Sequence, residues 1–252
     1  MTDKIALFNG CSFVWGDELQ DPYASRFSKL FADYTGMREV NLSLRGASNG
    51  RIYRTTLDHI QLNGEPDLMI IVWSGTDRFE YIDTDQKDAH DSYYLQCSVS
   101  RLHQKEFEEK RKSLTGYMVD IFTDYKASID TINYMCEIQM LCEKSNIPLL
   151  QFQFAHRHRD SIYLILNTKP KNDREKEFIN YYRSKIDYLK PYSTLGIKDN
   201  KNLLRLSMNI RDVTVAMIGR RMGAYGHPLE KSQVLFKEVI LEELERYYDI
   251  RF

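Results

Sequence analysis

Four short apolar segments recur along the chain, and each has the length and composition of a buried strand. They are Lys4–Asn9, Val40–Leu44, Leu68–Trp73 and Leu149–Phe154, which read KIALFN, VNLSL, LMIIVW and LLQFQF. Apolar runs of this length, bounded by glycine, proline or polar residues, are typical of strands covered on both faces. We predict that all four are neighbours in one parallel sheet.

Helical patterns lie between these segments and after the last one. They cover Ser25–Gly36, Asn49–Gly64, Asp124–Asn146 and Pro228–Tyr248. In the two longest of these segments, apolar positions repeat with the helical period of 3.6 residues. In Asp124–Asn146 they are Ile129, Ile132, Met135, Cys136, Ile138, Met140 and Leu141. In Pro228–Tyr248 they are Val234, Leu235, Val239, Ile240 and Leu244. Regular alternation of strand and helix predicts the α/β class, a three-layer α/β/α sandwich built from right-handed βαβ units.

Two segments interrupt this alternation. Phe79–Thr123 is acidic and aromatic, then strongly charged, and holds no clear strand, while His156–Asn202 is rich in Tyr, Lys and Asp. Both follow strands directly, so we expect them to rise from the carboxyl edge of the sheet, where α/β proteins place their ligand sites. The alternative is that they are surface insertions without a function. Because the chain has no internal repeat, low-complexity tract or linker, we expect a single domain over residues 1–252.

Composition narrows the classes of function. The formal net charge of the 252-residue chain is −1, which argues against a nucleic-acid or anionic-membrane partner. No apolar run approaches the ~20 residues of a membrane span, and the N-terminus lacks the pattern of a signal peptide. The 4 cysteines form no CxxC pair. We therefore expect a soluble cytoplasmic protein with free thiols.

Candidate chemistry lies at the ends of the predicted strands. Ser12 follows the first strand in the stretch NGCSF, which puts its Oγ at the open edge of the sheet, near helix N–H donors. Gly46 follows the second strand in a loop where a backbone N–H could approach a bound oxyanion. His227 stands just before the last helix, and Pro228 fixes the turn there.

The first two of these stretches match signatures of a known superfamily. Gly10-Cys11-Ser12 resembles the Gly-Asp-Ser nucleophile motif of the GDSL/SGNH hydrolases, with cysteine in place of aspartate. The superfamily's second signature is a glycine after the second strand, and the pattern Asn-x-x-x-x-Gly fits Asn41 and Gly46.

The third and fourth signatures are matched with departures. The third is Gly-x-Asn-Asp, and here Gly75-Thr76-Asp77 is preceded by Ser74, so Thr76 stands where Asn is expected. The fourth is Asp-x-x-His followed by Pro. His227 fits it, but Ala224 replaces the Asp. The set looks most similar to a divergent, phage-like branch with GCSF, GASN and GHP signatures.

The resemblance implies a fold, an activity and site residues. The fold would be SGNH-hydrolase-like with a flavodoxin-like parallel sheet. The activity would be that of a serine esterase or acyl hydrolase, such as an O-deacetylase of carbohydrate, with Ser12 and His227 as a catalytic dyad. The oxyanion hole would combine the backbone N–H groups of Ser12 and Gly46 with the Thr76 hydroxyl, a single donor on a shorter arm than Asn.

Ala224 leaves open which group orients His227. Asp212 and Glu230 are candidates on chemistry alone, and a main-chain carbonyl near Ala224 is the third. Under the dyad interpretation, we expect both acids to be dispensable. Loss of the acid costs a serine protease ~10⁴ in turnover, so a catalytically impaired protein is a second interpretation.

Substrate contacts are expected from Arg45, Asn49, Arg78 and His156. The two arginines flank the carboxyl edge and could bind an anionic or carboxylated substrate. Structural ion pairs of these arginines with Asp77 or Glu80 are an equally good explanation.

A metal site and a second nucleophile are both weaker ideas. His156, His158 and Asp160 lie close together in sequence, but two or three ligands from one short run are weak support for a metal site, and we expect no metal and no cofactor. Cys11 is a rival nucleophile, but a buried thiol is the simpler interpretation.

Two other classes of function stay open beside the esterase. One is a non-catalytic binding or virion-associated protein that keeps the fold, and homo-oligomerisation is equally open. The other is a flavodoxin-like nucleotide binder, which is weaker because no GxGxxG or Walker motif follows any strand. The expected partner is a small-molecule or carbohydrate ester. The expected location is the cytoplasm, or a virion if a phage encodes the protein.

Overall fold

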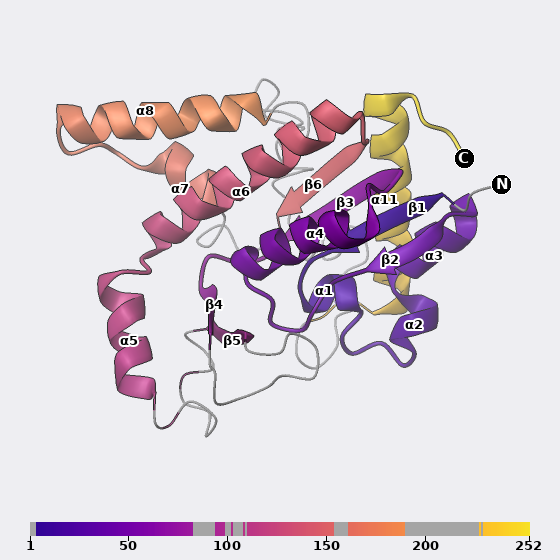
Figure 1. The fold of residues 1–252 in the computed structure, drawn as a ribbon, viewed down its shortest axis with the longest axis horizontal. Helices are drawn as coiled ribbons and strands as arrows, with labels where there is room; N and C mark the ends of the chain where they lie inside the picture. Colours follow the sequence, from indigo (N-terminus) through magenta and orange to yellow (C-terminus); the bar gives the residue numbers. More distant parts are fainter. Residues whose placement is uncertain are drawn as a thin grey trace.

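A parallel four-stranded sheet forms the centre of the molecule. The computed structural model describes residues 4–82, 94–98, 102, 108, 110–153, 161–189, 227 and 229–252. The strands β1 (Ile5–Asn9), β2 (Arg38–Asn41), β3 (Leu68–Trp73) and β6 (Leu149–Gln153) pair in the order β2-β1-β3-β6, and every pairing is parallel (Figure 1). The predicted parallel sheet is therefore confirmed.

The second strand differs in its bounds from the predicted Val40–Leu44. Its regular ladder begins at Arg38 and ends at Asn41, because the Asn41 side-chain oxygen accepts the Ser43 N–H at 3.0 Å and turns the chain. The segment still runs beside β1, since the N–H of Leu44 donates to the Gly10 carbonyl at 3.2 Å. This contact brings the loop after β2 next to the loop after β1.

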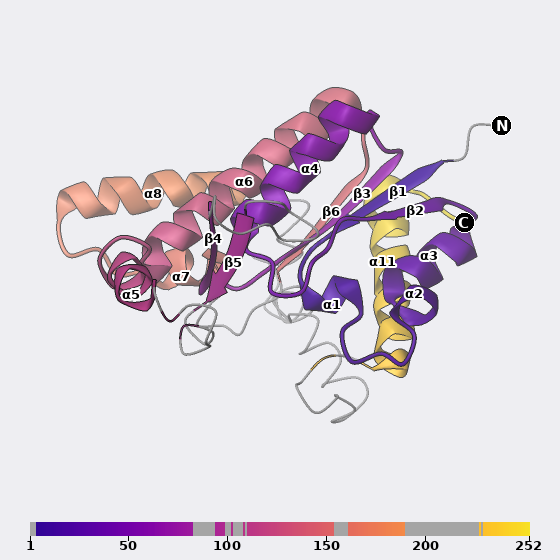
Figure 2. The same ribbon diagram turned by 60° about the horizontal axis from the view of Figure 1, so that its bottom comes forward.

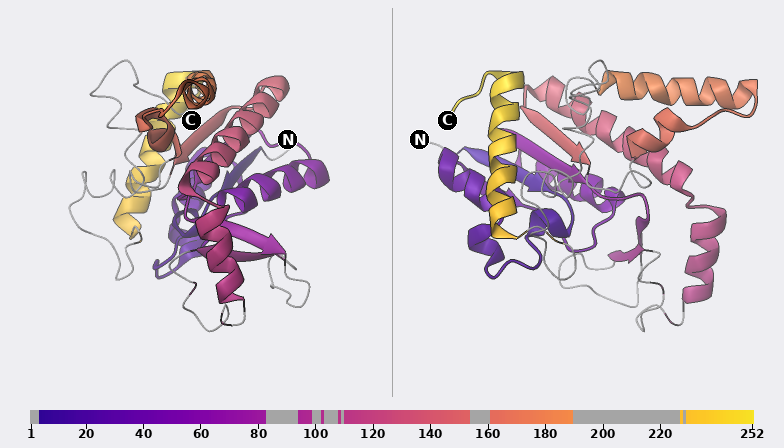
Figure 3. Two further views of the ribbon diagram at one scale, coloured as in Figure 1. Left: turned by 90° about the vertical axis from the view of Figure 1, so that its left-hand side faces the viewer. Right: turned by 180° about the vertical axis from the view of Figure 1, so that it is seen from behind.

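Helices cover both faces of the sheet. On one face, α4 (Asn49–Asn63) packs beside α6 (Asp124–Ser145); on the other, α3 (Phe27–Thr35) packs beside α11 (Glu230–Tyr248), as Figures 1 and 3 show from the front and from behind. Residues of β3 are all buried, as a central strand between two helical layers requires. The predicted three-layer α/β/α architecture is confirmed.

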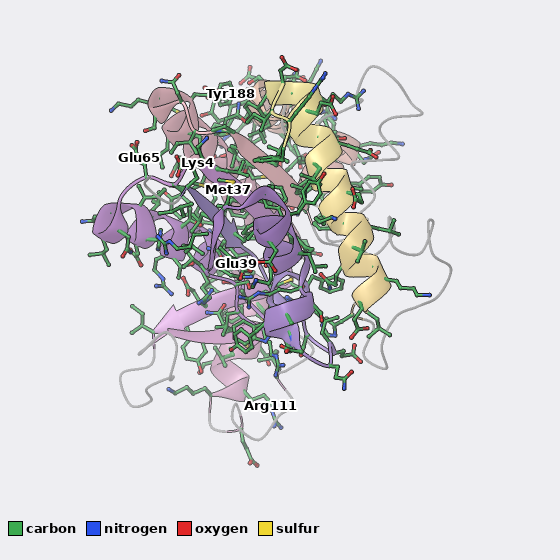
Figure 4. All side chains as sticks on the ribbon, turned by 90° about the vertical axis from the view of Figure 1, so that its right-hand side faces the viewer. Lys4, Met37, Glu39, Glu65, Arg111 and Tyr188 are labelled. Carbon is green, nitrogen blue, oxygen red and sulfur yellow. The ribbon has the colours of Figure 1, made fainter. Side chains whose placement is uncertain are left out.

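The buried face of the C-terminal helix agrees in part with the predicted one. Ile240 and Leu244 are buried as predicted, whereas Val234 is 45% exposed and Phe236 is buried in addition. The Phe236 ring lies 4.6 Å from that of Phe27, measured between centroids. Side chains fill the layer between α11 and the sheet (Figure 4). The buried Phe236 therefore ties α11 to α3.

The first insertion contains strands, which corrects the prediction that it has none. β4 (Arg78–Ile82) and β5 (Tyr94–Ser98) pair antiparallel, and helix α5 (Arg111–Asp120) follows (Figure 2). Phe79, Cys97 and Leu114 form a small apolar cluster of their own. The hairpin β4–β5 packs against α4, so the insertion borders the carboxyl edge of the sheet.

Four more helices complete the list for the described part of the chain. α1 (Ser12–Trp15) and α2 (Pro22–Ser25) follow β1, and α7 (Ser161–Asn167) and α8 (Asp173–Tyr188) belong to the second insertion. All 4 cysteines are buried and none forms a disulfide. Among the helices of the described ranges, none combines the length and apolarity needed to cross a membrane.

Candidate active site

The turn after β1 places Ser12 at the carboxyl edge of the sheet. Ser12 is the first residue of α1 and is 4% exposed. The turn is held by Asn9, whose amide donates to the Ile52 carbonyl and to Thr56 Oγ1, each at 2.9 Å, and accepts the Gly10 N–H at 2.8 Å. The end of β1 is thus fixed to α4, and with it the serine.

Gly10 is required by space. A Cβ atom at this position would lie 2.4 Å from a methyl carbon of Val14 and 2.9 Å from the backbone oxygen of Val72. The close approach of α1 and β3 to this turn therefore needs glycine, which explains the first residue of the Gly-Cys-Ser motif in physical terms.

His227 meets Ser12 from the opposite end of the sequence. Its Nε2 lies 3.0 Å from Ser12 Oγ, within the predicted hydrogen-bond range of the two groups. The imidazole side chain is 16% exposed and its ring lies 5.1 Å from that of Phe13, between centroids. A hydroxyl and an imidazole nitrogen at this distance can exchange a proton.

Glu18 forms a hydrogen bond with the second nitrogen of the imidazole. Its Oε2 lies 2.8 Å from His227 Nδ1 and also accepts the His227 backbone N–H at 2.9 Å. Gly16 ends α1 in the left-handed region at φ 87°, and Glu18 itself has a φ of 65°. Few non-glycine residues adopt this conformation, and such positions cluster at functional sites. The tight turn directs the carboxylate back toward the histidine.

This contact corrects the expected sources of the acid. Glu230 does not reach the histidine; its Oε1 accepts the Gln20 N–H at 3.3 Å. Asp212 and Ala224 lie outside the described residues. The Asp-x-x-His spacing of the superfamily places the acid three residues before the histidine and therefore does not predict Glu18. The available signal was the pair of acids Asp17-Glu18 directly after the helix-ending Gly16, one turn beyond the serine.

A second carboxylate lies on the outer side of the histidine. Asp17 Oδ2 is 3.8 Å from His227 Nε2, and Asp17 Oδ1 pairs with Arg45 Nε at 2.9 Å. The Arg45 side chain is 59% exposed and lies over the Trp15 ring. Arg45 therefore stands at the exposed border of the site, paired with Asp17 rather than with Asp77 or Glu80.

Two backbone donors remain available beside the serine. Within the described part of the chain, neither the N–H of Ser12 nor that of Gly46 donates a hydrogen bond. Gly46 has a φ of 76°, which glycine adopts without strain. Because Leu44 is bonded to the Gly10 carbonyl, the Gly46 loop runs next to the serine turn. Donors of this kind can stabilise a developing oxyanion.

Thr76 is directed away from such a role. Its side chain is buried, and its hydroxyl donates to Asp124 Oδ1 at 3.4 Å. A hydroxyl has one proton to give. The oxyanion role of Thr76 therefore stays a prediction, because this contact uses the one proton that the role would need.

Asn49 is also occupied within the fold. It is 5% exposed, donates to the Ser74 carbonyl at 3.0 Å and to Thr131 Oγ1 at 2.9 Å, and accepts the Ser74 N–H at 2.6 Å. The side chain therefore connects α4, α6 and the end of β3. A substrate contact of Asn49 stays a prediction.

The remaining expected substrate residues fall in different places. Arg78 opens β4 and donates to Ser74 Oγ at 2.9 Å, whereas Glu80 pairs with Arg54 at 3.0 Å. His156, like His158 and Asp160, lies outside the described residues. Within the ranges that the structure describes, no group of three or more His, Cys, Asp or Glu side chains is placed to hold a metal.

Comparison with known proteins identifies the fold. No protein-family model matches the chain, and no curated protein matches its sequence. A crystal structure of TesA matches with a TM-score of 0.50 at 13% identity, over 96% of this chain and 99% of that one.

Two further solved structures are similar at lower TM-scores. The psychrotrophic esterase EstA from Pseudoalteromonas sp. matches with a TM-score of 0.48 at 13% identity, over 98% of this chain and 100% of that one. A putative GDSL-like lipase from Parabacteroides merdae gives 0.42 at 11% identity, over 96% and 95% of the two chains. With its parallel sheet and its helical layers, the chain has a three-layer α/β/α fold similar to that of TesA.

Proposed function

We propose that the protein is a serine esterase in which Ser12 attacks an acyl carbonyl, His227 acts as general base and Glu18 orients the imidazole. One observation carries the proposal: Ser12 Oγ, His227 and Glu18 form a continuous chain of contacts at 3.0 and 2.8 Å. These groups come from two ends of the sequence, and the carboxylate and the imidazole are only partly buried, with side chains 15% and 16% exposed.

The first half of the reaction follows from this geometry. As Ser12 Oγ bonds to the carbonyl carbon, its proton passes to His227 Nε2, and the carbonyl oxygen becomes an oxyanion. The backbone N–H groups of Ser12 and Gly46 donate to that oxygen. When the tetrahedral intermediate collapses, Nε2 returns the proton to the departing alcohol, and an acyl-Ser12 ester remains.

The second half repeats these roles with water. His227 Nε2 removes a proton from a water molecule that attacks the acyl-serine. When the second tetrahedral intermediate collapses, the carboxylic acid is released and Nε2 returns the proton to Ser12 Oγ. Glu18 holds the Nδ1 proton throughout. This keeps Nε2 unprotonated in the resting enzyme and stabilises the imidazolium that forms in each half.

An O-acyl carbohydrate is the substrate that we propose for this esterase. Support comes from Phe79, Tyr117 and Phe122 of the first insertion, which line a separate cavity near the start of α4 and not the surroundings of Ser12. Flat rings of this kind pack against the apolar face of a sugar. Arg45, at the exposed border of the site, adds a hydrogen-bond donor for the polar groups of such a substrate.

Hydrolysis of p-nitrophenyl acetate tests the esterase assignment. We expect the wild-type protein to release p-nitrophenolate, and we expect Ser12→Ala and His227→Ala each to lower kcat by at least ~10³-fold. Circular dichroism of each variant controls for folding. A folded wild-type protein without turnover, on this ester and on acetylated sugars, would favour the alternative of a non-catalytic binding protein.

A further inference from the structure

A cavity lies between the start of α4 and the first insertion, and neither Ser12 nor His227 lines it. It has a volume of about 390 Å³ and is formed by the start of α4, by β4, by α5 with the residues after it, and by the first turns of α6. This volume falls within the range of ~300–1,000 Å³ that is usual for small-molecule sites. The loops after β2 and β3 both contribute to its wall, through Ser48 and Thr76.

Aromatic rings form two of its walls. Tyr53 and Tyr134 are stacked with their centroids 4.5 Å apart and 16° between their planes. Tyr117 and Phe122 are stacked at 5.9 Å and 15°, and the Phe79 ring lies 5.1 Å from Tyr117. Flat apolar surfaces suit a ring that has C–H groups on its faces and polar groups on its edge.

The charged side chains of the cavity leave one cation without a carboxylate. Arg54 pairs with Glu80 at 3.0 Å, and Lys126 pairs with Asp130 on the same helix. The remaining cation is Arg78, and among the described residues its guanidinium bonds only to the Ser74 hydroxyl, at 2.9 Å. The lining thus carries an excess of one positive charge.

We propose that this cavity binds a monoanionic sugar of the uronic-acid type. The ring packs between the aromatic walls, the carboxylate pairs with Arg78, and the hydroxyls donate to Glu80 and Asp130. A guanidinium and a carboxylate form two parallel hydrogen bonds, which fixes the orientation of the sugar.

The same features disfavour two other anions. An aromatic carboxylate has no hydroxyl groups that could donate to Glu80 and Asp130 beside their partners Arg54 and Lys126, so it would make fewer polar contacts than a sugar. A phosphate monoester carries nearly two negative charges, and it would face two carboxylates with a single unpaired cation. The sugar carboxylate matches both the charge and the polar groups.

Isothermal titration of the full-length protein with sodium D-glucuronate tests this proposal independently of catalysis, since the probe carries no ester. We expect glucuronate to bind, and D-glucose and acetate each to bind at least about tenfold more weakly, because each offers only part of the contacts. Arg78→Met should weaken glucuronate binding about tenfold or more, Arg78→Lys less, and Tyr117→Ala should weaken glucuronate and glucose alike.

Arg246→Met is the matched control, because Arg246 lies on α11, across the sheet from the cavity, and should leave binding unchanged. Circular dichroism identifies any variant that fails to fold. Absence of glucuronate binding up to ~20 mM would overturn the proposal. So would equal affinity for acetate and glucuronate, or an affinity that Arg78→Met leaves unchanged in a folded protein.

Discussion

In the proposed mechanism, Glu18 orients the histidine. Glu18 and Ser12 then lie in one short segment, which would carry both the nucleophile and the group that orients the base. Ala224 stands at the acid position of the superfamily's signature and has no carboxylate. In the proposed mechanism, Glu18 supplies the missing carboxylate from the other end of the chain.

Replacing Glu18 tests this compensation. Glu18→Gln keeps the size of the side chain but can present an N–H to Nδ1 of His227, which favours the wrong tautomer. We expect kcat for p-nitrophenyl acetate to fall by ~10³–10⁴ with the fold retained. The control is Glu230→Gln, which should keep kcat within about twofold, because Glu230 contacts Gln20 and not the histidine. Equal activity of Glu18→Gln and wild type would show that the contact has no catalytic role.

Thr76 offers a second test at the residue scale. Because its hydroxyl is directed to Asp124, Thr76→Val should leave kcat nearly unchanged, within about twofold. Loss of a true oxyanion donor costs ~10²–10³ in rate. Steady-state kinetics on p-nitrophenyl acetate distinguish these two outcomes. A loss of ~10²–10³ in a folded variant would show that the Thr76 hydroxyl is an oxyanion donor.

Among the elements, the meeting point of β1, α1 and β3 controls the position of the serine. Gly10→Ala would place a Cβ 2.9 Å from the Val72 backbone oxygen, which cannot move without shifting β3. We expect a loss of ~1–3 kcal/mol in the free energy of unfolding, as overpacking usually costs.

Urea denaturation measures the effect of this substitution, with Gly36→Ala as a comparison. No atom lies within 4 Å of a Cβ at Gly36, so only its left-handed backbone (φ 71°) is penalised there. If Gly10→Ala were as stable as wild type, the close packing around Gly10 would not be a constraint on the turn.

The elements that sequence predicted well are those with an unbroken apolar pattern. β3, with six buried residues in succession, was placed with its observed bounds. The hairpin was missed because β4 alternates polar and apolar residues over a short span, and its partner β5 follows at a distance along the chain. Alternation alone, in the run Arg78–Ile82, was the signal for a half-buried strand.

The candidate site was predictable where a residue's place follows from strand order, and not where it depends on a local turn. Ser12 and His227 were placed together because both flank the carboxyl edge. The position of the Glu18 side chain depends on positive φ angles at Gly16 and at Glu18 itself, in the turn after α1. A periodic pattern of apolar residues does not predict such a turn. The roles predicted for Asn49 and Thr76 stay open, because small polar residues at strand ends bind neighbouring groups of the fold as readily as substrate.

At the scale of the whole molecule, buried thiols and phenols predict a loss of stability in alkali. Burial raises the pKa of Cys142 from 9.0 to about 12 and that of Cys136 to about 11. Above pH 9, the unfolded chain releases these protons while the folded chain keeps them, so the free energy of unfolding falls as pH rises toward the folded pKa values. The slope is at most about 1.4 kcal/mol per pH unit for each group.

Urea denaturation at intervals from pH 8 to 10.5 measures this slope. Cys142→Ala should lower stability by ~1 kcal/mol at pH 8, since it leaves a small gap beside Met69, and should make the decline above pH 9 shallower. A midpoint that stays constant up to pH 10.5 in the wild type would contradict the burial of these thiols.

The central claim is that Ser12 is a nucleophile activated by a histidine and a glutamate drawn from opposite ends of the chain. Intact-mass spectrometry after treatment with a fluorophosphonate, followed by peptide mapping, tests it most directly. We predict a single adduct on Ser12 in the wild type, and far slower labelling in His227→Ala and Glu18→Gln, because the serine then lacks its base or the base lacks its orientation. A folded wild-type protein that stays unlabelled, or an adduct on another residue, would contradict the account.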